Sequence, residues 1–486
     1  MTDQTGPATR AYHERTKLFP GASTAPRRVD AALVPKQYKR YVDLPSLELP
    51  APSIAGRSLF EVLAHPAGNA RPLSLAGLAA LLHYAGGIVR RRNLDGRELA
   101  FRAASCTGAL YHVEFYLVCG EVDGALPDGV YHYDVPSGSL REMRRGDYRG
   151  ALAAACCDEG IATAAASVVL TSTFWRNAWR YEERAYRHVF WDAGTLLANL
   201  LAVAESHSLG PVLYSAFVDG DVNALLGLDA RREAEVAVVS LGVGEPAQHV
   251  RAAAPLTLAT EPLSRAEIEY PLIWQTHAAT SLRDCDEVRA WRSRAAAESP
   301  ELSTSVPAEV LTLEESIERR VSARRFSETP LPREALRTVL GAAKGSLRSD
   351  HALAHMLCRP MLIVNRVEGL DDGAYGVDAQ DRLMLLSRGN YAAAAAHLAL
   401  DQPAAGSAAV NLYFIAGLDE VTSAVGERGY RAVQLEAGIR TGQVYLASTA
   451  LGLKATGLTF YDDEVSRFFD LDPLDALMLM LVAFGA

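Results

Sequence analysis

The sequence predicts an α+β protein built from two copies of one domain. Alternating apolar residues, typical of strands, interleave with helical periodicity along the chain. Residues 129–148 and 181–194 recur 243 or 244 positions later, at 373–391 and 425–438. With 486 residues, 49% of them hydrophobic and 22% charged, the chain is long enough for two cores. We therefore expect a covalent pseudo-dimer.

The first copy follows an irregular arm, residues 1–55, that is rich in Pro, Arg and Lys. The domain is expected at 56–250, with helices covering a sheet. Its periodicity predicts helices at 72–87, 182–207 and 221–227, a hairpin at 129–143, and strands at 166–174 and 236–244. Within 101–120, a loop of small residues is expected to lead into a strand that contains Val113, Phe115 and Leu117.

A linker is expected at 251–310, where the periodicity weakens and Ala, Ser and Pro accumulate. The second domain is expected at 311–486. It opens on residues 330–340, which repeat 72–82.

Charge and composition exclude several classes of partner. A formal net charge of −10 and a pI near 5.7 argue against nucleic acid, which requires a basic surface. The polar start and the absence of a long apolar run predict a cytoplasmic protein without a membrane span. The six cysteines include no CxxC pair and no His partner at metal-ligand spacing, so we expect reduced thiols and no metal site.

The segment RVSARRF, residues 320–326, carries the main functional signal. In an extended conformation alternate side chains lie on one side, so Arg320, Ser322 and Arg324 can converge on a phosphate and its sugar-like tail while Phe326 enters a core. The alternative is a solvated basic segment that opens a helix.

Four further segments complete a resemblance to a known family. They are the loop RAASCTGALYHVE at 102–114, GVYHYD at 129–134, and the paired helical motifs RYEERAYRHVFWDAG at 180–194 and VGERGYRAVQLEAG at 425–438. Together with RVSARRF they resemble the FMN-dependent nitroreductase fold, and within it the SagB-type azoline dehydrogenases. The resemblance implies two nitroreductase-like domains, each with a mostly antiparallel sheet flanked by helices, and an FMN between them.

The resemblance also implies which residues bind FMN, and that only one site is complete. The first half has Ala64 and Pro66 where the second has Ser322 and Arg324, and the second half lacks the small-residue loop. Taken alone, the loop favours a plain turn that enters a strand. The implied cofactor-binding residues are Arg320, Ser322, Arg324, Arg102, Ser105, Cys106, Thr107, Gly108, Leu458 and Thr459.

The SagB-type branch places a Lys-Tyr pair ahead of its Glu-Arg-x-Tyr-Arg helix, and this sequence has Arg180-Tyr181 there. Removing a hydride and a proton from an azoline requires a base near the flavin. Tyr181 can serve if Arg180 lowers the pKa of its phenol. The alternative is that both residues pack or pair structurally.

The resemblance implies a dehydrogenase that converts thiazolines or oxazolines to azoles in a ribosomally made peptide. Its expected partners are an azoline-containing precursor peptide and a cyclodehydratase. Two other functions stay open: a generic nitroreductase-like FMN oxidoreductase that uses NAD(P)H, and a flavin-free peptide-binding subunit.

Overall fold

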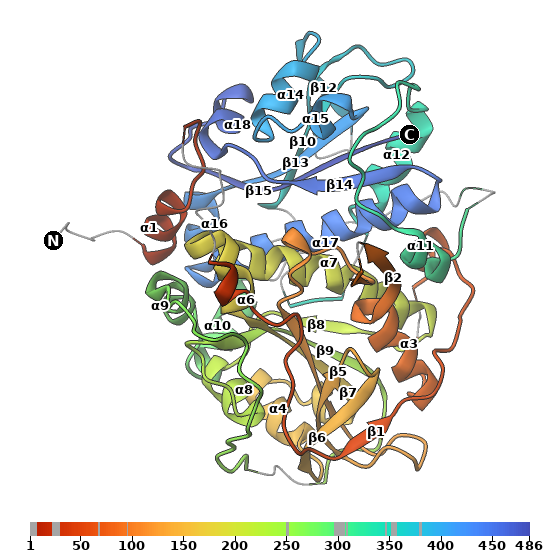
Figure 1. The fold of residues 1–486 in the computed structure, drawn as a ribbon, viewed down its shortest axis with the longest axis vertical. Helices are drawn as coiled ribbons and strands as arrows, with labels where there is room; N and C mark the ends of the chain where they lie inside the picture. Colours follow the sequence, from red (N-terminus) through yellow and green to blue (C-terminus); the bar gives the residue numbers. More distant parts are fainter. Residues whose placement is uncertain are drawn as a thin grey trace, which may run out of the picture.

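The computed structural model describes residues 7–21, 30–66, 69–94, 96–248, 252–295, 307, 310–345, 348–350, 357–378 and 382–486. Two α+β halves lie along the long axis, one above the other (Figure 1). The predicted fold class, an α+β duplication in which helices flank antiparallel sheets, is confirmed.

The first half contains a seven-stranded antiparallel sheet. Its helices include α2 (Leu59–Ala64), α3 (Leu75–Gly86), α4 (Arg149–Cys156), α5 (Gly160–Thr163), α6 (Phe174–Tyr181), α7 (Ala185–Ser206) and α8 (Asp219–Leu226). The Ser74 hydroxyl caps the start of α3, and Gly87 follows its end, as the sequence predicted. The strand order is β1 (Ser46–Glu48), β6 (Ser139–Arg145), β5 (Gly129–Asp134), β4 (Val113–Cys119), β7 (Ala164–Thr173), β9 (Glu233–Val243) and β8 (Val212–Tyr214).

In the described residues, the second half contains a six-stranded sheet whose strands correspond to those of the first half apart from β1. Its order is β12 (Leu383–Arg388), β11 (Gly373–Val377), β10 (Arg359–Val364), β13 (Val410–Gly417), β15 (Ala476–Gly485) and β14 (Lys454–Leu458). Its helices include α11 (Leu313–Arg319), α12 (Arg333–Ala342), α14 (Ala392–Leu398), α15 (Pro403–Ser407), α16 (Leu418–Val425), α17 (Arg428–Ala450) and α18 (Asp462–Phe468).

A ribbon of two strands, which the sequence analysis did not predict, leads into the loop at 102–114. It is formed by β2 (Ile88–Leu94) and β3 (Arg97–Arg102).

The long helices α7 and α17 pack against each other between the two sheets (Figure 1). Their contact centres on Gly194 and Gly438, which occupy equivalent positions of the two copies. A Cβ added to Gly194 would lie 2.6 Å from the Gly438 backbone, and one added to Gly438 would lie 2.6 Å from the Trp191 carbonyl. Glycine is therefore required at this crossing, and the two halves share one core.

Buried ion pairs repeat on both sides of this crossing. Arg184 and Arg187 of the first half donate to Asp462 of the second, at 2.9 and 2.6 Å. Arg428 and Arg431 of the second half donate to Asp219 of the first, at 2.6 and 2.7 Å. The Glu-Arg-x-Tyr-Arg motif of each copy therefore binds the opposite half.

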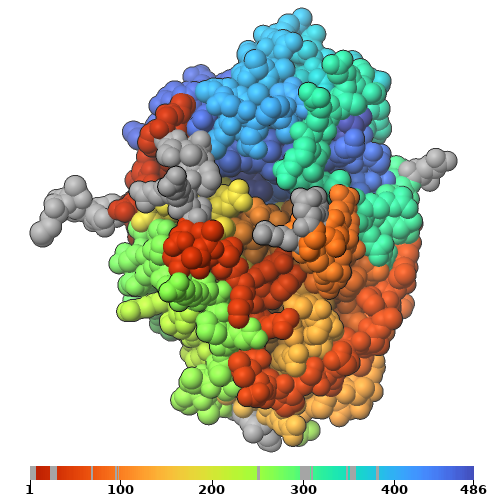
Figure 2. All heavy atoms as spheres, in the orientation of Figure 1, coloured from red at the N-terminus to blue at the C-terminus, as the bar shows by residue number. Residues whose placement is uncertain are grey.

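The arm contains a helix that packs on the opposite half. Helix α1 (Ala8–Arg15) leads into Thr16 and Leu18, and the residues around it (dark red) lie against the second half (blue) in Figure 2. The His13 carbonyl and the Thr16 hydroxyl accept from Arg187, and the Leu18 N–H donates to Asp462.

The segment expected as a linker repeats this arrangement. It contains α9 (Pro271–Ala279) and α10 (Cys285–Ala295). The His277 carbonyl and Thr280 hydroxyl accept from Arg431, and the Leu282 N–H donates to Asp219. Each copy is therefore preceded by its own His-x-x-Thr-x-Leu segment. The expected boundaries at 55, 250 and 310 stay a prediction.

One expectation about the cysteines is wrong. Cys157 and Cys285 form a disulfide, with their Cα atoms 5.6 Å apart. Cys157 follows α4 in a left-handed conformation and faces the start of α10. The two cysteines are 128 positions apart in the sequence, so their spacing did not predict the pairing. Cys106, Cys119, Cys156 and Cys358 are free thiols. In the described residues, no helix is both long and apolar enough to cross a membrane.

Candidate functional site

Arg320 joins the two segments that the sequence singled out, one from each half. Its Nε donates to the Ala103 carbonyl at 3.1 Å and its Nη2 to the Arg102 carbonyl at 3.4 Å. From the first-half ribbon, Arg90 Nη2 donates back to the Arg320 carbonyl at 2.8 Å. The segment 320–326 therefore lies against the loop at 102–108.

The segment 455–463, which holds the predicted FMN residues Leu458 and Thr459, lies beside the same stretch. Ala323 N–H donates to the Ala455 carbonyl at 3.0 Å. The Tyr445 hydroxyl lies 3.3 Å from Ser322 Oγ and accepts from Gly457 N–H at 2.5 Å. Leu458 packs with the buried Phe326, while Thr459 is half-buried just after β14. All three predicted segments thus meet at one place between the halves.

The three RVSARRF donors differ in exposure. Ser322 and Arg324 are exposed, whereas Arg320 is buried and donates to main-chain carbonyls of the other half. Its guanidinium thus holds the loop, and burial lowers its pKa. That Arg320, Ser322 and Arg324 bind one ligand stays a prediction.

Arg102 is buried beneath the loop. It donates to the carbonyls of Gly86 and Val113, the latter at 3.3 Å. Within the described part of the chain, its Nη2 has no hydrogen-bond partner. The side chain lines a small cavity together with Ser105 and Cys106. An unpaired guanidinium N–H in a cavity favours an acceptor group of a ligand.

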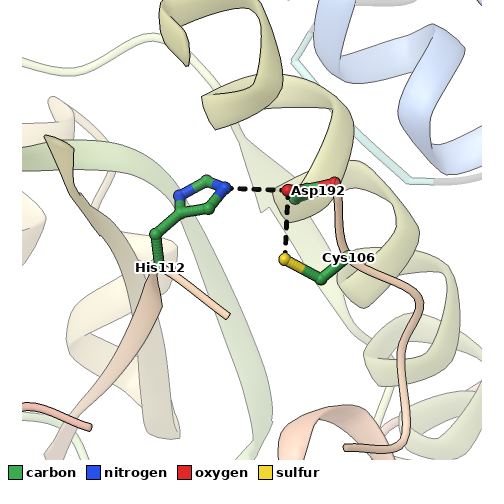
Figure 3. A group of neighbouring side chains, drawn as sticks. All are labelled: Cys106, His112 and Asp192. Carbon is green, nitrogen blue, oxygen red and sulfur yellow. Dashed lines mark hydrogen bonds and ion pairs between the residues drawn. The ribbon is translucent and has the colours of Figure 1, made fainter. Parts of the chain in front are cut away.

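Asp192 on α7 accepts hydrogen bonds from the loop (Figure 3). Its Oδ1 accepts from the Thr107 N–H and hydroxyl, both at 2.9 Å, and its Oδ2 accepts from Cys106 Sγ at 3.1 Å. His112 Nε2 lies 2.8 Å from the same Oδ2, and its Nδ1 lies 2.8 Å from Ser172 Oγ. One carboxylate therefore orders the small residues that the sequence predicted as a flavin wall.

The charge states follow from burial and from these bonds. Burial works to raise the pKa of Asp192, but the hydrogen bond and charge of His112 outweigh it, so the net shift is downward. Burial and the Asp192 charge raise the pKa of Cys106 well above its usual value. Cys106 is therefore a thiol that donates to a carboxylate, rather than a thiolate nucleophile.

Two groups of His, Cys and carboxylate ligand atoms lie close together in the described residues: Cys106, His112 and Asp192, and Asp219, Glu235 and His277. Hydrogen bonds and ion pairs account for both groups. Neither needs a metal to explain its geometry.

Tyr181 reaches the loop from the end of α6. A Cβ added to Gly108 would lie 2.7 Å from the Tyr181 hydroxyl, and Gly108 has φ 62°. Arg180 is exposed, with its guanidinium 5.7 Å from the Tyr181 ring centre. Burial raises the pKa of Tyr181 to about 12, and the opposing effect of Arg180 is smaller. The expected acidification of this phenol is wrong, because desolvation outweighs the neighbouring cation.

Two further polar side chains on α7, His188 and Tyr186, lie within hydrogen-bonding distance of residues outside the loop. His188 Nδ1 lies 2.8 Å from Asn177 Oδ1, and burial lowers the pKa of His188 to about 3. The Tyr186 hydroxyl is fully buried, 3.3 Å from His277 Nδ1. One polar atom of each side chain is thus engaged away from the loop, and the His188 ring packs edge-on against Tyr181, with the ring centres 4.6 Å apart.

Sequence reasoning missed Asp192, His112 and Tyr445 as site residues. Asp192 and His112 stand inside the segments 180–194 and 102–114, so their motifs were noticed without their role. Tyr445 carries no local signal, because it lies within the buried helix α17.

Both halves match one family model, that of the nitroreductase family, at residues 69–245 and 317–486. The putative nitroreductase MJ1384 of Methanocaldococcus jannaschii is 28% identical over 156 residues, 32% of this chain and 75% of that protein. A crystal structure of a putative nitroreductase from Anabaena variabilis superposes with a TM-score of 0.78 at 24% identity, covering 99% of both chains.

A chain of the E. coli microcin synthetase McbBCD complex is 22% identical over 37% of this chain and 70% of its own length, with a TM-score of 0.32. The Anabaena variabilis structure is thus the one of these that shares the fold of both halves together.

Proposed function

This chain belongs to the nitroreductase family, and from that premise we propose that it binds one FMN between its halves and oxidises azoline rings. The substrates are thiazolines or oxazolines in a ribosomally made peptide. A cyclodehydratase, which forms such rings, is the expected partner.

The contact of Arg320 with the loop carbonyls carries the cofactor part of the proposal, since it brings both predicted FMN segments to one place. Beside that contact, Arg324 and Ser322 expose a cation and a hydroxyl at alternate positions. Arg324 would pair with the phosphate, Ser322 with the hydroxyl-bearing tail, and Arg102 Nη2 with an acceptor. When bound, FMN would supply the hydride acceptor; the proton lost from the adjacent carbon would pass to water, and dioxygen, which an assay in air provides, would take up the two electrons.

A matched pair of variants tests FMN binding. Losing a charge-assisted contact of about 1.5 to 3 kcal/mol weakens binding roughly 10- to 150-fold, so Arg324→Ala should raise the FMN dissociation constant by that factor. Arg325→Ala is the control, because Arg325 is an exposed arginine of the same segment, next to Arg324, and is not among the predicted FMN ligands. Equal effects of the two substitutions, or two FMN per chain by absorbance, would contradict the proposal.

The proximity of Tyr181 to Gly108 supports the azoline part. A phenol with a pKa of about 12 keeps its proton at neutral pH, so Tyr181 acts as a hydrogen-bond donor and not as the base. We assign it the role of orienting the substrate ring at the loop.

A second candidate is a nitroreductase fed by NAD(P)H, which is favoured by the similarity to a putative nitroreductase. The two are separated by one pair of assays on the FMN-loaded protein. Conversion of a thiazoline peptide in air, with loss of two mass units and no NADPH, supports the first. Reduction of a nitroarene by NADPH without azoline conversion supports the second.

A further inference from the structure

The outer edges of the two sheets differ, although the sheets are copies. They lie at opposite ends of the long axis (Figure 1). In the first half, β1 of the arm pairs antiparallel with the outer strand β6, with Leu47 opposite Leu140. In the second half, β12 is the outermost strand, and no strand in the described residues covers it.

The residues of β12 are apolar where those of β6 are charged. Leu385 pairs with Tyr375 as Glu142 pairs with the equivalent Tyr131, and Met384 stands in the place of Arg141. Met384, Leu385 and Leu386 are 47%, 43% and 49% exposed. Three consecutive apolar side chains cover both faces of an open edge, an arrangement that soluble proteins normally avoid.

The charges flanking this edge are arranged symmetrically. Arg382 and Arg388 stand three positions before and after Leu385. Each is paired with an aspartate of its own chain, Arg382 with Asp378 at 2.8 Å and Arg388 with Asp371 at 2.6 Å. About Leu385, the strand is therefore self-complementary at Met384 and Leu386 and at Arg382 and Arg388, while Leu383 would face Ser387.

We propose that β12 pairs antiparallel with β12 of a second copy of this chain, about a two-fold axis at Leu385. Antiparallel pairing about that axis sets Leu385 against Leu385 and Met384 against Leu386 of the other copy. At each end, an Arg–Asp pair of one chain meets an Arg–Asp pair of the other, with no net charge. An isologous contact requires such self-complementarity, and pairing removes the open edge.

Light scattering on the full chain tests the proposal. At about 10 µM the chain should have a mass near twice its 52.3 kDa. Leu385→Lys places two ammonium groups against each other on the axis and should weaken the dimer at least tenfold. Leu474→Lys is the control: Leu474 is 66% exposed and lies outside β12, so the dimer should persist.

A cross-link checks the register. Oxidation of the Leu385→Cys variant should give a covalent dimer that reduction separates, whereas Leu474→Cys should not. A wild-type mass of one chain would overturn the proposal and leave the edge to a strand of another protein. A dimer that survives Leu385→Lys would also overturn it.

Discussion

Asp462 is the residue at which the union of the two halves is most directly testable. Its side chain is 1% exposed and accepts from two buried arginines, one 7% and the other 0% exposed. Asp462→Asn preserves the shape but leaves two buried guanidinium groups without a counter-ion. Breaking a buried ion pair costs about 3 to 5 kcal/mol, so we expect the free energy of unfolding to fall by that amount.

The pseudo-symmetric variant Asp219→Asn should cost less, about 1 to 3 kcal/mol. The reason is Glu235, which lies 3.4 Å from Arg431 and can take over the negative charge. Burial and the charge of Asp219 now raise the pKa of Glu235, and removing that charge favours its ionisation. The corresponding strand of the second half carries apolar residues there.

Urea unfolding followed by circular dichroism measures both variants. Asp470→Asn is the control, because Asp470 is exposed in a left-handed conformation that Asn tolerates. It should change the unfolding free energy by less than about 0.5 kcal/mol. A loss below about 1 kcal/mol for Asp462→Asn would refute the inference that these arginines depend on it. Equal losses of unfolding free energy in Asp462→Asn and Asp219→Asn would refute the inference that Glu235 takes over the charge of Asp219.

Four further outcomes are expected. Burial raises the folded pKa values of Asp462 and Asp219, but the paired arginines lower them by more, so both are below the unfolded value near 4. The two carboxylates therefore stabilise the fold fully above that value, and the stabilisation is lost as the pH falls below it. The urea midpoint should drop steeply under about pH 5, and the drop should be smaller in Asp462→Asn. Tyr181→Phe should slow azoline oxidation about tenfold, the value of one hydrogen bond, with FMN retained; a basic limb below pH 9 that disappears in the variant would contradict a pKa of about 12. Gly108→Ala, at φ 62° and against the Tyr181 hydroxyl, should lower the unfolding free energy by about 1 to 2 kcal/mol and weaken FMN binding in a fluorescence titration. Asp192→Asn should weaken FMN binding about tenfold by loosening the loop, whereas Glu436→Gln at the equivalent position should not.

The fold could be predicted because its signals are local and are repeated. Periodicity gave α7 within three residues at either end, and the duplication followed from segments that recur at a constant offset. Helices α1 and α9 were missed for a physical reason. His13, Thr16 and Leu18 act through a main-chain carbonyl, a hydroxyl and a main-chain N–H, so the repeat is confined to three residues. These recur 264 positions later, not 243 or 244, and so fall outside the constant offset of the other repeats.

The site could be predicted as a set of segments but not as a set of contacts. Spacing placed Arg320 and Arg324 on one side of a strand, yet it cannot show that Arg320 crosses into the other half. Residue type suggested that Arg180 acidifies Tyr181, yet the sign of the pKa shift depends on desolvation, a property of the whole fold. Asp192 was hidden because its partners come from a loop 85 positions away.

The two copies are alike at the ion pairs that join the halves and differ at the predicted FMN site. The buried Arg–Asp ion pairs occur in both copies because removing either aspartate would leave a buried charge unpaired. At the place of Asp192 the second half has Glu436, which accepts from Arg440 of its own helix at 2.9 Å, and Arg440 donates in turn to the Cys358 carbonyl. Arg440 thus supplies the counter-charge of that carboxylate. A second site would have Ala64 and Pro66 in the places of Ser322 and Arg324, and neither side chain offers a cation or a hydroxyl to a phosphate. We therefore expect one FMN per chain.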